Sequence, residues 1–260
     1  KKIHNPNSFE DIEKSNNRLI FEEFLILQLG LSRLKYENKR KKGFLCNKSI
    51  DISEFYNSLP FELTRAQKRA IDECISDFKT GRLMNRLLQG DVGSGKTLVA
   101  EAAAYYIIKN GGQAAFMVPT AILASQHFEN ISRVFTPLGI KTEILTGNCP
   151  KSQRKKILND LINRDIDIIV GTHSLLEDDV VFKNLGLIIC DEQHRFGVAQ
   201  RSKLTLKGEN PHLLVMSATP IPRTLALIIY GDLDISVLDE LPPGRQPVIT
   251  HLVNENKRDA

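Results

Sequence analysis

The stretch Leu87-Leu88-Gln89-Gly90-Asp91-Val92-Gly93-Ser94-Gly95-Lys96-Thr97-Leu98-Val99-Ala100 decides the fold. Its apolar start predicts a buried strand, and Gly90–Thr97 matches the phosphate-binding loop in full. In such a loop, backbone N–H groups curl around phosphates, and the helix that begins near Lys96 directs the positive end of its dipole at them. Strand, loop and alanine-rich helix in this order predict an α/β fold.

Short apolar runs alternate with helical segments from residue 84 onward, as in a parallel sheet with crossover helices. Six runs are strand candidates: Met84–Gln89, Gln113–Val118, Lys141–Leu145, Asp167–Val170, Gly186–Cys190 and Leu213–Ser217. We therefore expect a central parallel sheet flanked by helices.

Two amphipathic helices are expected before the sheet. Residues 1–16 are polar and unpatterned, which predicts a loop or the tail of whatever precedes them, and from Asn17 apolar residues recur at helical spacing. The apolar stripe is wide enough to pack on two sides, and the helix should end near the basic run 39–42. That run could contact a phosphate backbone, although most short charge runs are solvated. Thr64 is a suitable N-cap for the second helix.

Composition restricts the function only weakly. The 260 residues include 35 basic and 31 acidic side chains, and the net charge of +4 permits a polyanionic partner without demonstrating one. Four separated cysteines favour reduced thiols in a cytosolic protein over a zinc site. No stretch approaches the roughly 20 apolar residues of a membrane span, and no signal-peptide pattern is present. Since the chain does not begin with Met, we expect a piece of a longer protein.

Two carboxylates, Asp191 and Glu192, follow the strand candidate that ends at Cys190. Ligands bind at the carboxyl ends of strands in such sheets. We expect Lys96 to reach the β- and γ-phosphates of ATP, Thr97 and Asp191 to hold Mg²⁺, and Glu192 to activate the attacking water. An isolated Asp-Glu pair is often a solvated turn, but the upstream phosphate loop favours the catalytic interpretation.

Weaker candidates surround these residues. Gln67, within Phe61–Gln67, has an amide that suits the edge of adenine, although an exposed Gln on a helix usually binds nothing. Ser217 and Thr219 follow the last strand candidate and could sense the γ-phosphate through Glu192, or be ordinary turn residues.

Together these motifs resemble the first motor domain of superfamily 2 helicases, and in particular the RecG family of ATP-dependent branched-DNA helicases of bacteria. The resemblance is carried by Arg18–Glu23, Gly90–Thr97, Asp191–Val198, Thr219–Ala226 and Asp239–Arg245. It implies a RecA-like P-loop domain at residues 59–240. Residues 1–58 would be a helical extension that connects this domain to a preceding wedge domain. Residues 241–260 would form a linker to a second motor domain.

The resemblance also implies ATP and Mg²⁺ as cofactors, branched DNA and the other domains of the same chain as partners, and a cytoplasmic location without a membrane. It assigns nucleotide binding to Phe61, Gln67, Gly90, Asp91, Val92, Gly93, Ser94, Gly95, Lys96 and Thr97. It assigns contacts with the DNA backbone to Pro119, Thr120, Thr146, Gly147, Gly171, Thr172 and His173. It assigns coupling of hydrolysis to movement to His194, Ser217 and Thr219. Taken singly, each of the loop residues would more simply be a cap.

Three alternatives stay open. The transcription-repair coupling translocase shares Arg195–Val198 and Pro220–Thr224, whereas Gly93–Gly95, Gln193 and Tyr230–Asp234 favour RecG. A non-motor phosphotransferase would need an acceptor pocket and lid. A nucleotide-regulated binding module would have no use for an intact catalytic pair.

The resemblance places the arginine finger in the second motor domain. Such a finger contributes a factor of about 10³–10⁵ in rate. We therefore expect this chain alone to bind nucleotide, to hydrolyse it very slowly and to unwind nothing.

Overall fold

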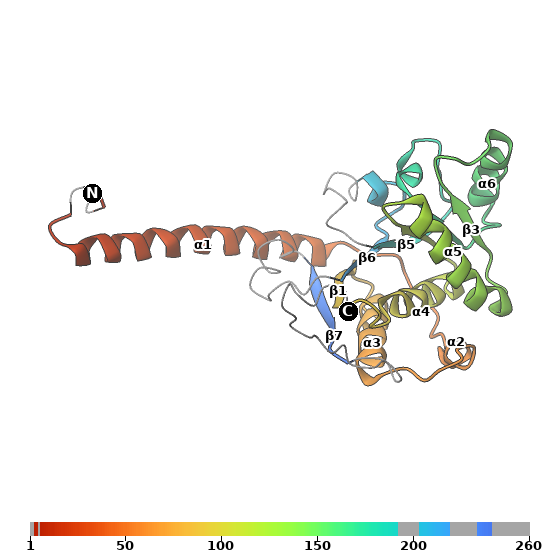
Figure 1. The fold of residues 1–260 in the computed structure, drawn as a ribbon, viewed down its shortest axis with the longest axis horizontal. Helices are drawn as coiled ribbons and strands as arrows, with labels where there is room; N and C mark the ends of the chain where they lie inside the picture. The colour runs from red at the N-terminus through yellow and green to blue at the C-terminus, as the bar shows by residue number, and fades with distance from the viewer. Residues whose placement is uncertain (1–2, 5, 192–202, 219–232, 241–260) are drawn as a thin grey trace, which may run out of the picture.

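The computed structural model describes residues 3–4, 6–191, 203–218 and 233–240. The helices are α1 (Phe9–Arg40), α2 (Ser53–Asn57), α3 (Arg65–Lys79), α4 (Lys96–Lys109), α5 (Ala121–Phe135) and α6 (Lys151–Asn163), with 3-10 turns η1 (Thr136–Leu138) and η2 (His173–Leu176). The strands are β1 (Asn85–Gly90), β2 (Gln113–Met117), β3 (Thr142–Leu145), β4 (Ile168–Gly171), β5 (Leu185–Cys190), β6 (His212–Ser217) and β7 (Asp234–Leu238). Figure 1 shows their arrangement.

All seven strands form one sheet in the order β3-β4-β2-β5-β6-β1-β7, and every neighbouring pair is parallel. Successive residues of a strand enter different cores, because side chains alternate between the faces of a sheet. Leu88 packs with α3, α4 and α5 on one face, and Leu87 packs with α6 and η2 on the other. The predicted α/β fold with helices on both faces is confirmed.

The six predicted strands are all present, with ends shifted by one residue at most. Five of them lie inside the sheet, where burial on both faces produces the continuous apolar runs that made them visible. The seventh strand, β7, was not predicted. It lies at the edge of the sheet with a mixed burial pattern.

The prediction of a loop over residues 1–16 is wrong, because α1 begins at Phe9. The N–H of Asp11 donates to the hydroxyl of Ser8 at 3.3 Å, which caps the helix. Lys14 pairs with Glu10 one turn earlier, at 2.6 Å. These short-range polar contacts start the helix before its apolar stripe begins.

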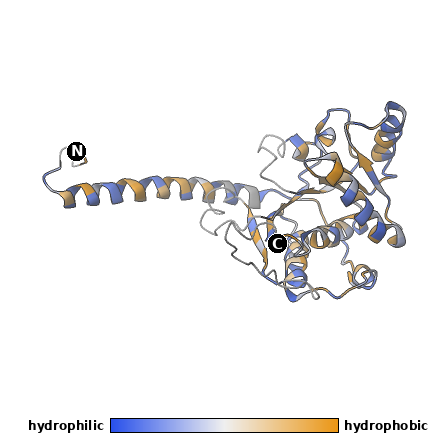
Figure 2. Ribbon diagram, in the orientation of Figure 1, coloured by the Kyte–Doolittle hydropathy of each residue, from blue (hydrophilic) through white to orange (hydrophobic). Residues whose placement is uncertain are grey.

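Helix α1 projects from the body of the molecule (Figure 1), and apolar residues follow one another along it (Figure 2). Phe21, Phe24 and Leu29 are among its exposed apolar side chains. Near the body, the ammonium group of Lys35 lies 2.6 Å from the carboxylate of Asp234 on β7. The long helix is therefore tied to the edge strand of the sheet.

Helix α3 begins at Arg65, and Thr64 is its N-cap as predicted. The hydroxyl of Thr64 accepts from the N–H of Gln67, and the side chain of Gln67 accepts from the N–H of Thr64. This reciprocal pair is a capping box, which satisfies two donors at the start of the helix. It also fixes the side chain of Gln67, which is important at the site described below.

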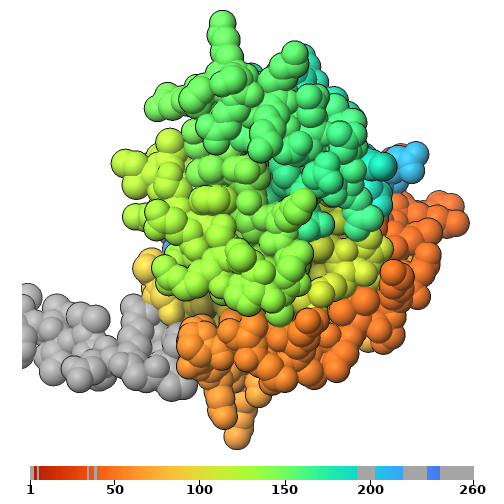
Figure 3. Space-filling model, turned by 90° about the vertical axis from the view of Figure 1, so that its right-hand side faces the viewer, coloured from red at the N-terminus to blue at the C-terminus, as the bar shows by residue number. Residues whose placement is uncertain are grey.

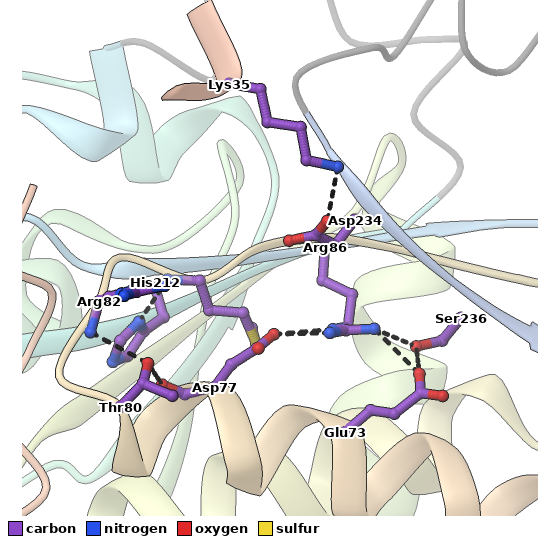
Figure 4. A network of polar contacts seen from close by, with 10 residues as sticks. Lys35, Glu73, Asp77, Thr80, Arg82, Arg86, His212, Asp234 and Ser236 are labelled. Carbon is purple, nitrogen blue, oxygen red and sulfur yellow. Dashed lines mark hydrogen bonds and ion pairs between the residues drawn. The ribbon is translucent and has the colours of Figure 1, made fainter. Parts of the chain in front are cut away.

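A polar cluster around the buried Arg86 joins α3, β1 and β7 (Figure 4). Arg86 of β1 donates to Asp77 at 2.7 Å, to Glu73 at 2.9 Å and to Ser236 of β7 at 2.7 Å. Its buried guanidinium group depends on these partners, because an unpaired buried charge is unfavourable. The cluster therefore holds β7 against the strand that leads into the phosphate-binding loop.

His212, at the start of β6, is fully buried and links three segments. Figure 4 shows it beside Arg82. Burial lowers the pKa of its imidazole to about 4. The ring is therefore neutral at pH 7: Nδ1 accepts from the N–H of Met84, and Nε2 donates to the carbonyl of Phe44, each at 3.0 Å.

On the face shown in Figure 3, the α2–α3 region (orange) lies below α5 (light green), and residues around α6 (green) lie at the top. Eleven consecutive residues of α4, from Leu98 to Ile108, are buried. No helix in the described part of the chain is long and apolar enough to cross a membrane. The four cysteines form no disulfide.

Candidate functional site

The carboxyl ends of all seven strands lie along one edge of the sheet, because every pair is parallel. Asp191 follows β5, Ser217 ends β6 and the phosphate-binding loop follows β1, and these three strands are consecutive in the sheet. Neighbouring strands are about 4.8 Å apart, so the ends of β1 and β5 are separated by roughly 10 Å across β6. That span suits a nucleoside triphosphate with a bound metal ion.

The loop between β1 and α4 requires glycine at three positions. Gly93 and Gly95 have φ angles of 77° and 87°, in the left-handed region that disfavours side chains. A Cβ at Gly95 would also overlap Nε2 of Gln67, and one at Gly90 would lie 2.6 Å from Oγ of Ser94. The glycines thus let the loop curl tightly against its surroundings.

Polar groups converge inside the loop. Nζ of Lys96 donates to the carbonyls of Gly90 and Asp91, each at 2.8 Å, so the ammonium group is held over the loop. Helix α4 begins at Lys96 with Gly95 as its N-cap, which has no side chain to accept from the first N–H groups. The hydroxyl of Ser94 is buried and has no partner among the described residues.

These features fit a polyphosphate. An ammonium group, an uncapped helix amino terminus and an orphan hydroxyl all favour an anion with several oxygens. Within the described residues, no three His, Cys, Asp or Glu side chains are grouped to hold a metal ion by themselves. Mg²⁺ in nucleotide sites takes one or two side-chain oxygens and completes its shell with phosphates and water. Thr97 and Asp191 offer such oxygens.

The amide of Gln67 is already engaged at both ends. Its Oε1 accepts from the N–H of Thr64 at 3.0 Å, and its Nε2 donates to the carbonyl of Ser94 at 2.8 Å. The residue is only 3% exposed. It therefore joins the start of α3 to the phosphate-binding loop. Phe61, three residues before Thr64, is 57% exposed.

Asp191 is fixed from two neighbouring elements. Its N–H donates to the carbonyl of Met117 at the end of β2, at 3.0 Å. Its Oδ2 lies 3.1 Å from Nε2 of His127 on α5, and the two side chains are 17% and 13% exposed. Sequence reasoning did not identify His127, because one histidine within an amphipathic helix has no distinguishing spacing.

The remaining catalytic and coupling candidates divide into described and undescribed positions. Ser217 is buried and pairs in register with Gln89, next to the loop. Glu192, His194 and Thr219 lie outside the described residues.

The candidates for DNA contact follow three further strands of the same edge, in the order β3-β4-β2, while none of the candidate sites follows β7. Thr146 and Gly147 follow β3, and Pro119 and Thr120 follow β2. Thr120 caps α5 by accepting from the N–H of Leu123 at 3.3 Å. The described edge therefore has a half with the nucleotide candidates, β5-β6-β1, and a half with the DNA candidates, β3-β4-β2.

The segment after β4 is partly closed. Gly171 and Thr172 are buried, whereas His173 is exposed. A Cβ at Gly171 would overlap the carbonyl of Leu145, and the hydroxyl of Thr172 lies 3.4 Å from that of Ser174. Among these three residues, the side chain accessible to a large partner is that of His173.

Comparison with known proteins agrees with this arrangement. Residues 64–228 match the family model described as DEAD/DEAH box helicase. The chain is 49% identical to the ATP-dependent DNA helicase RecG of Aquifex aeolicus, with 100% of this chain and 34% of that protein covered. It is 50% identical to the RecG of Thermotoga maritima, with 96% of this chain and 32% of that protein covered.

A solved structure described as RecG bound to a three-way DNA junction superimposes with a TM-score of 0.81 at 47% identity, covering 94% of this chain and 33% of that one. The resemblance expected from the motifs is confirmed. The chain spans about a third of the length of these relatives.

Proposed function

This chain belongs to the DEAD/DEAH box helicase family, and we propose that it is the ATP-binding part of an ATP-dependent helicase or translocase acting on branched DNA. The longer protein would regress replication forks and process Holliday junctions in repair and recombination in the bacterial cytoplasm. The related RecG proteins and the DNA junction named for the solved relative support this proposal. They give no support to the transcription-repair coupling alternative.

The observation that carries the proposal is the juxtaposition of the phosphate-binding loop and Asp191 on one edge of a parallel sheet, two strands apart. A loop that only turned the chain would not need a buried hydroxyl without a partner at Ser94. A lone carboxylate after a strand would not be oriented from two elements, as Asp191 is.

In this proposal Lys96 turns from the loop carbonyls to the β- and γ-phosphates of ATP. Thr97 would hold Mg²⁺ through its hydroxyl, Asp191 would hold it through its hydration shell, and Glu192 would orient the attacking water. Bound Mg²⁺ would neutralise charge that develops on the phosphates. Ser217, His194 and Thr219 would transmit the state of the γ-phosphate to the rest of the motor.

The same proposal assigns the nucleotide base to Gln67 and Phe61 and the DNA backbone to the loops after β2, β3 and β4. Hydroxyl and N–H groups in such loops bond phosphate oxygens without reading sequence. Gln67 would keep its bond to Ser94 while its region meets adenine, so base binding and loop geometry would be linked. The domain arrangement, with 1–58 as an extension, 59–240 as the motor domain and 241–260 as a linker, is part of this proposal.

The test is Glu192→Gln in the full-length protein. We expect the variant to keep ATP binding and DNA binding and to lose hydrolysis and fork remodelling, because the substitution removes only the group that orients water. ATPase rates should be measured with branched, linear duplex and single-stranded DNA at one salt concentration, since phosphate contacts make affinity salt-dependent.

Lys96→Ala is the matched control, and it should lose nucleotide binding itself. Fork remodelling that persists unchanged in Glu192→Gln would overturn both the role of Glu192 and the motor proposal. Equal stimulation of the wild type by all three DNA forms would exclude a preference for branched DNA.

A further inference from the structure

His127 is a partly buried polar side chain with no part in the proposed chemistry. It lies on α5 and packs its ring 4.7 Å, between centroids, from that of Phe116 on β2. Its Nε2 meets Oδ2 of Asp191 at 3.1 Å, across 64 positions of sequence. In the described part of the chain its Nδ1 is buried and has no partner. The hydrogen bond that the ring makes in this part of the chain is therefore the one with the carboxylate of Asp191.

The bond defines the proton on the ring. A carboxylate only accepts, so Nε2 carries the hydrogen and donates to Oδ2. The bond from His127 therefore holds Oδ2 of Asp191 at a fixed place beside α5. Partners of this kind orient metal-binding carboxylates, and losing one typically weakens metal binding or activity about 10–100-fold.

The position of His127 along α5 gives this contact a second consequence. Thr120 caps the helix and belongs to a loop proposed to meet DNA, and His127 follows seven residues later. At 3.6 residues per turn, seven residues are close to two full turns, so both residues lie on one side of the helix. Since β2 and β5 are neighbours in the sheet, α5 reaches from the proposed DNA half of the edge to Asp191 of the nucleotide half.

We propose that His127 is a positioning residue that holds the Asp191 carboxylate for Mg²⁺ and makes its orientation depend on α5. This inference rests on the proposed function, because it assigns His127 through the metal role of Asp191. The alternative is that His127 serves only to pack against Phe116, in which case its contact with Asp191 would have no effect on metal binding.

Substitutions separate these two roles. His127→Leu keeps apolar packing against Phe116 and removes the donor. His127→Gln places its amide nitrogen near the position of Nε2 and can still donate to Asp191. His127→Asn places its amide nitrogen near the position of Nδ1 and cannot reach Oδ2. The Gln and Asn variants are therefore matched in chemistry and differ in reach.

The measurement is Mn²⁺ binding to the full-length protein with a non-hydrolysable ATP analogue, followed by electron paramagnetic resonance. We expect His127→Leu and His127→Asn to bind Mn²⁺ about 10–100-fold more weakly than the wild type. His127→Gln should stay close to the wild type, and all variants should bind the metal-free nucleotide equally well. Thermal unfolding checks that each variant is folded.

The inference is overturned if His127→Asn binds Mn²⁺ like the wild type, or if His127→Gln is as weak as His127→Asn. The second result would mean that ring packing, and not the donor, is what Asp191 requires. Should His127→Leu fail to fold, the Gln and Asn pair decides alone. If the wild type binds no Mn²⁺ together with the nucleotide, the proposed function fails as well. If only the variants depart from expectation, the role of His127 fails and the proposed function stands.

Discussion

Gly95 meets two separate demands at one residue. Its φ of 87° disfavours any side chain, and a Cβ there would overlap the amide of Gln67 that holds the carbonyl of Ser94. Gly139 meets only the first demand, since its φ is 71° and nothing lies within 4 Å of the Cβ it would acquire. The two glycines therefore separate backbone strain from crowding.

We predict that Gly139→Ala costs roughly 1–2 kcal/mol of stability, from the left-handed backbone alone. Gly95→Ala should cost roughly 1–3 kcal/mol more, because the amide of Gln67 must leave Ser94. It should also weaken nucleotide binding, whereas Gly139→Ala should not. Urea unfolding and titration with a fluorescent ATP analogue measure both effects. Equal losses in both properties would contradict a role for the Gln67 contact.

At this scale the sequence predicts contiguous motifs well and tertiary contacts poorly. Gly90–Thr97 and Asp191 were found because a single local mechanism demands several residue types at fixed spacing. The contact between His127 and Asp191 leaves no such pattern, since it depends on how α5 packs beside β2. The capping role of Thr64 was predicted, but the second bond of Gln67, to Ser94, depends on the approach of α3 to the loop.

Among the elements, α4 is unusual in being buried on nearly every side. A helix of this kind has no polar face, and an ionisable residue within it is held away from water. Glu101 is such a residue: it is 5% exposed, and burial raises the pKa of its carboxyl from 4.5 to about 8. The protonated form is therefore the one that the folded chain prefers.

Because the folded pKa of Glu101 lies above the unfolded value, its contribution to stability is complete below pH 4.5 and is lost as the pH rises through about 8. We predict that Glu101→Gln removes this pH-dependent loss of unfolding free energy, because an amide does not ionise. Relative to the wild type, the variant should gain on the order of 4 kcal/mol between pH 4.5 and pH 8.

The measurement is the free energy of unfolding of both chains across this range. Taking the difference between them at each pH cancels His212, whose lowered pKa gives a slope of opposite sign below pH 6.5. A difference that does not change with pH would show that Glu101 is ionised in the folded chain.

Element boundaries follow the same logic as residue contacts. Interior strands such as β5 were predicted because burial on both faces demands an unbroken apolar run. The edge strand β7, with sequence Asp234-Ile-Ser-Val-Leu238, is a short segment of mixed polarity that gives no clear strand pattern. Its strand conformation depends on hydrogen bonding to β1. The start of α1 was placed too late because its first turns depend on capping and ion pairs and not on an apolar stripe.

For the whole molecule, the chain covers about a third of its relatives. We predict that it binds ATP when isolated but hydrolyses it about 10³–10⁵-fold more slowly than the full-length protein with DNA, because the proposed function assigns the arginine finger to a second motor domain. Steady-state ATPase and fluorescent-nucleotide binding check this, with Lys96→Ala as the chain that should not bind. Rapid turnover stimulated by DNA in the isolated chain would contradict the prediction.

The place of β7 has a mechanical consequence. Its last residue, Leu238, is in register with Gly90, and the next two side chains grip α3: Asp239 accepts from Arg69 at 2.8 Å, and Glu240 accepts from the N–H of Ala66 at 3.1 Å. Gly90 and the end of β7 are therefore joined directly by the hydrogen bonds between β1 and β7. A change in the backbone at Gly90 would be transmitted through these bonds to the point where the chain leaves the sheet. Any force applied from beyond Glu240 would load these contacts with α3 and then β7, which pairs with the strand before the proposed triphosphate site, so we expect tension and nucleotide affinity to vary together.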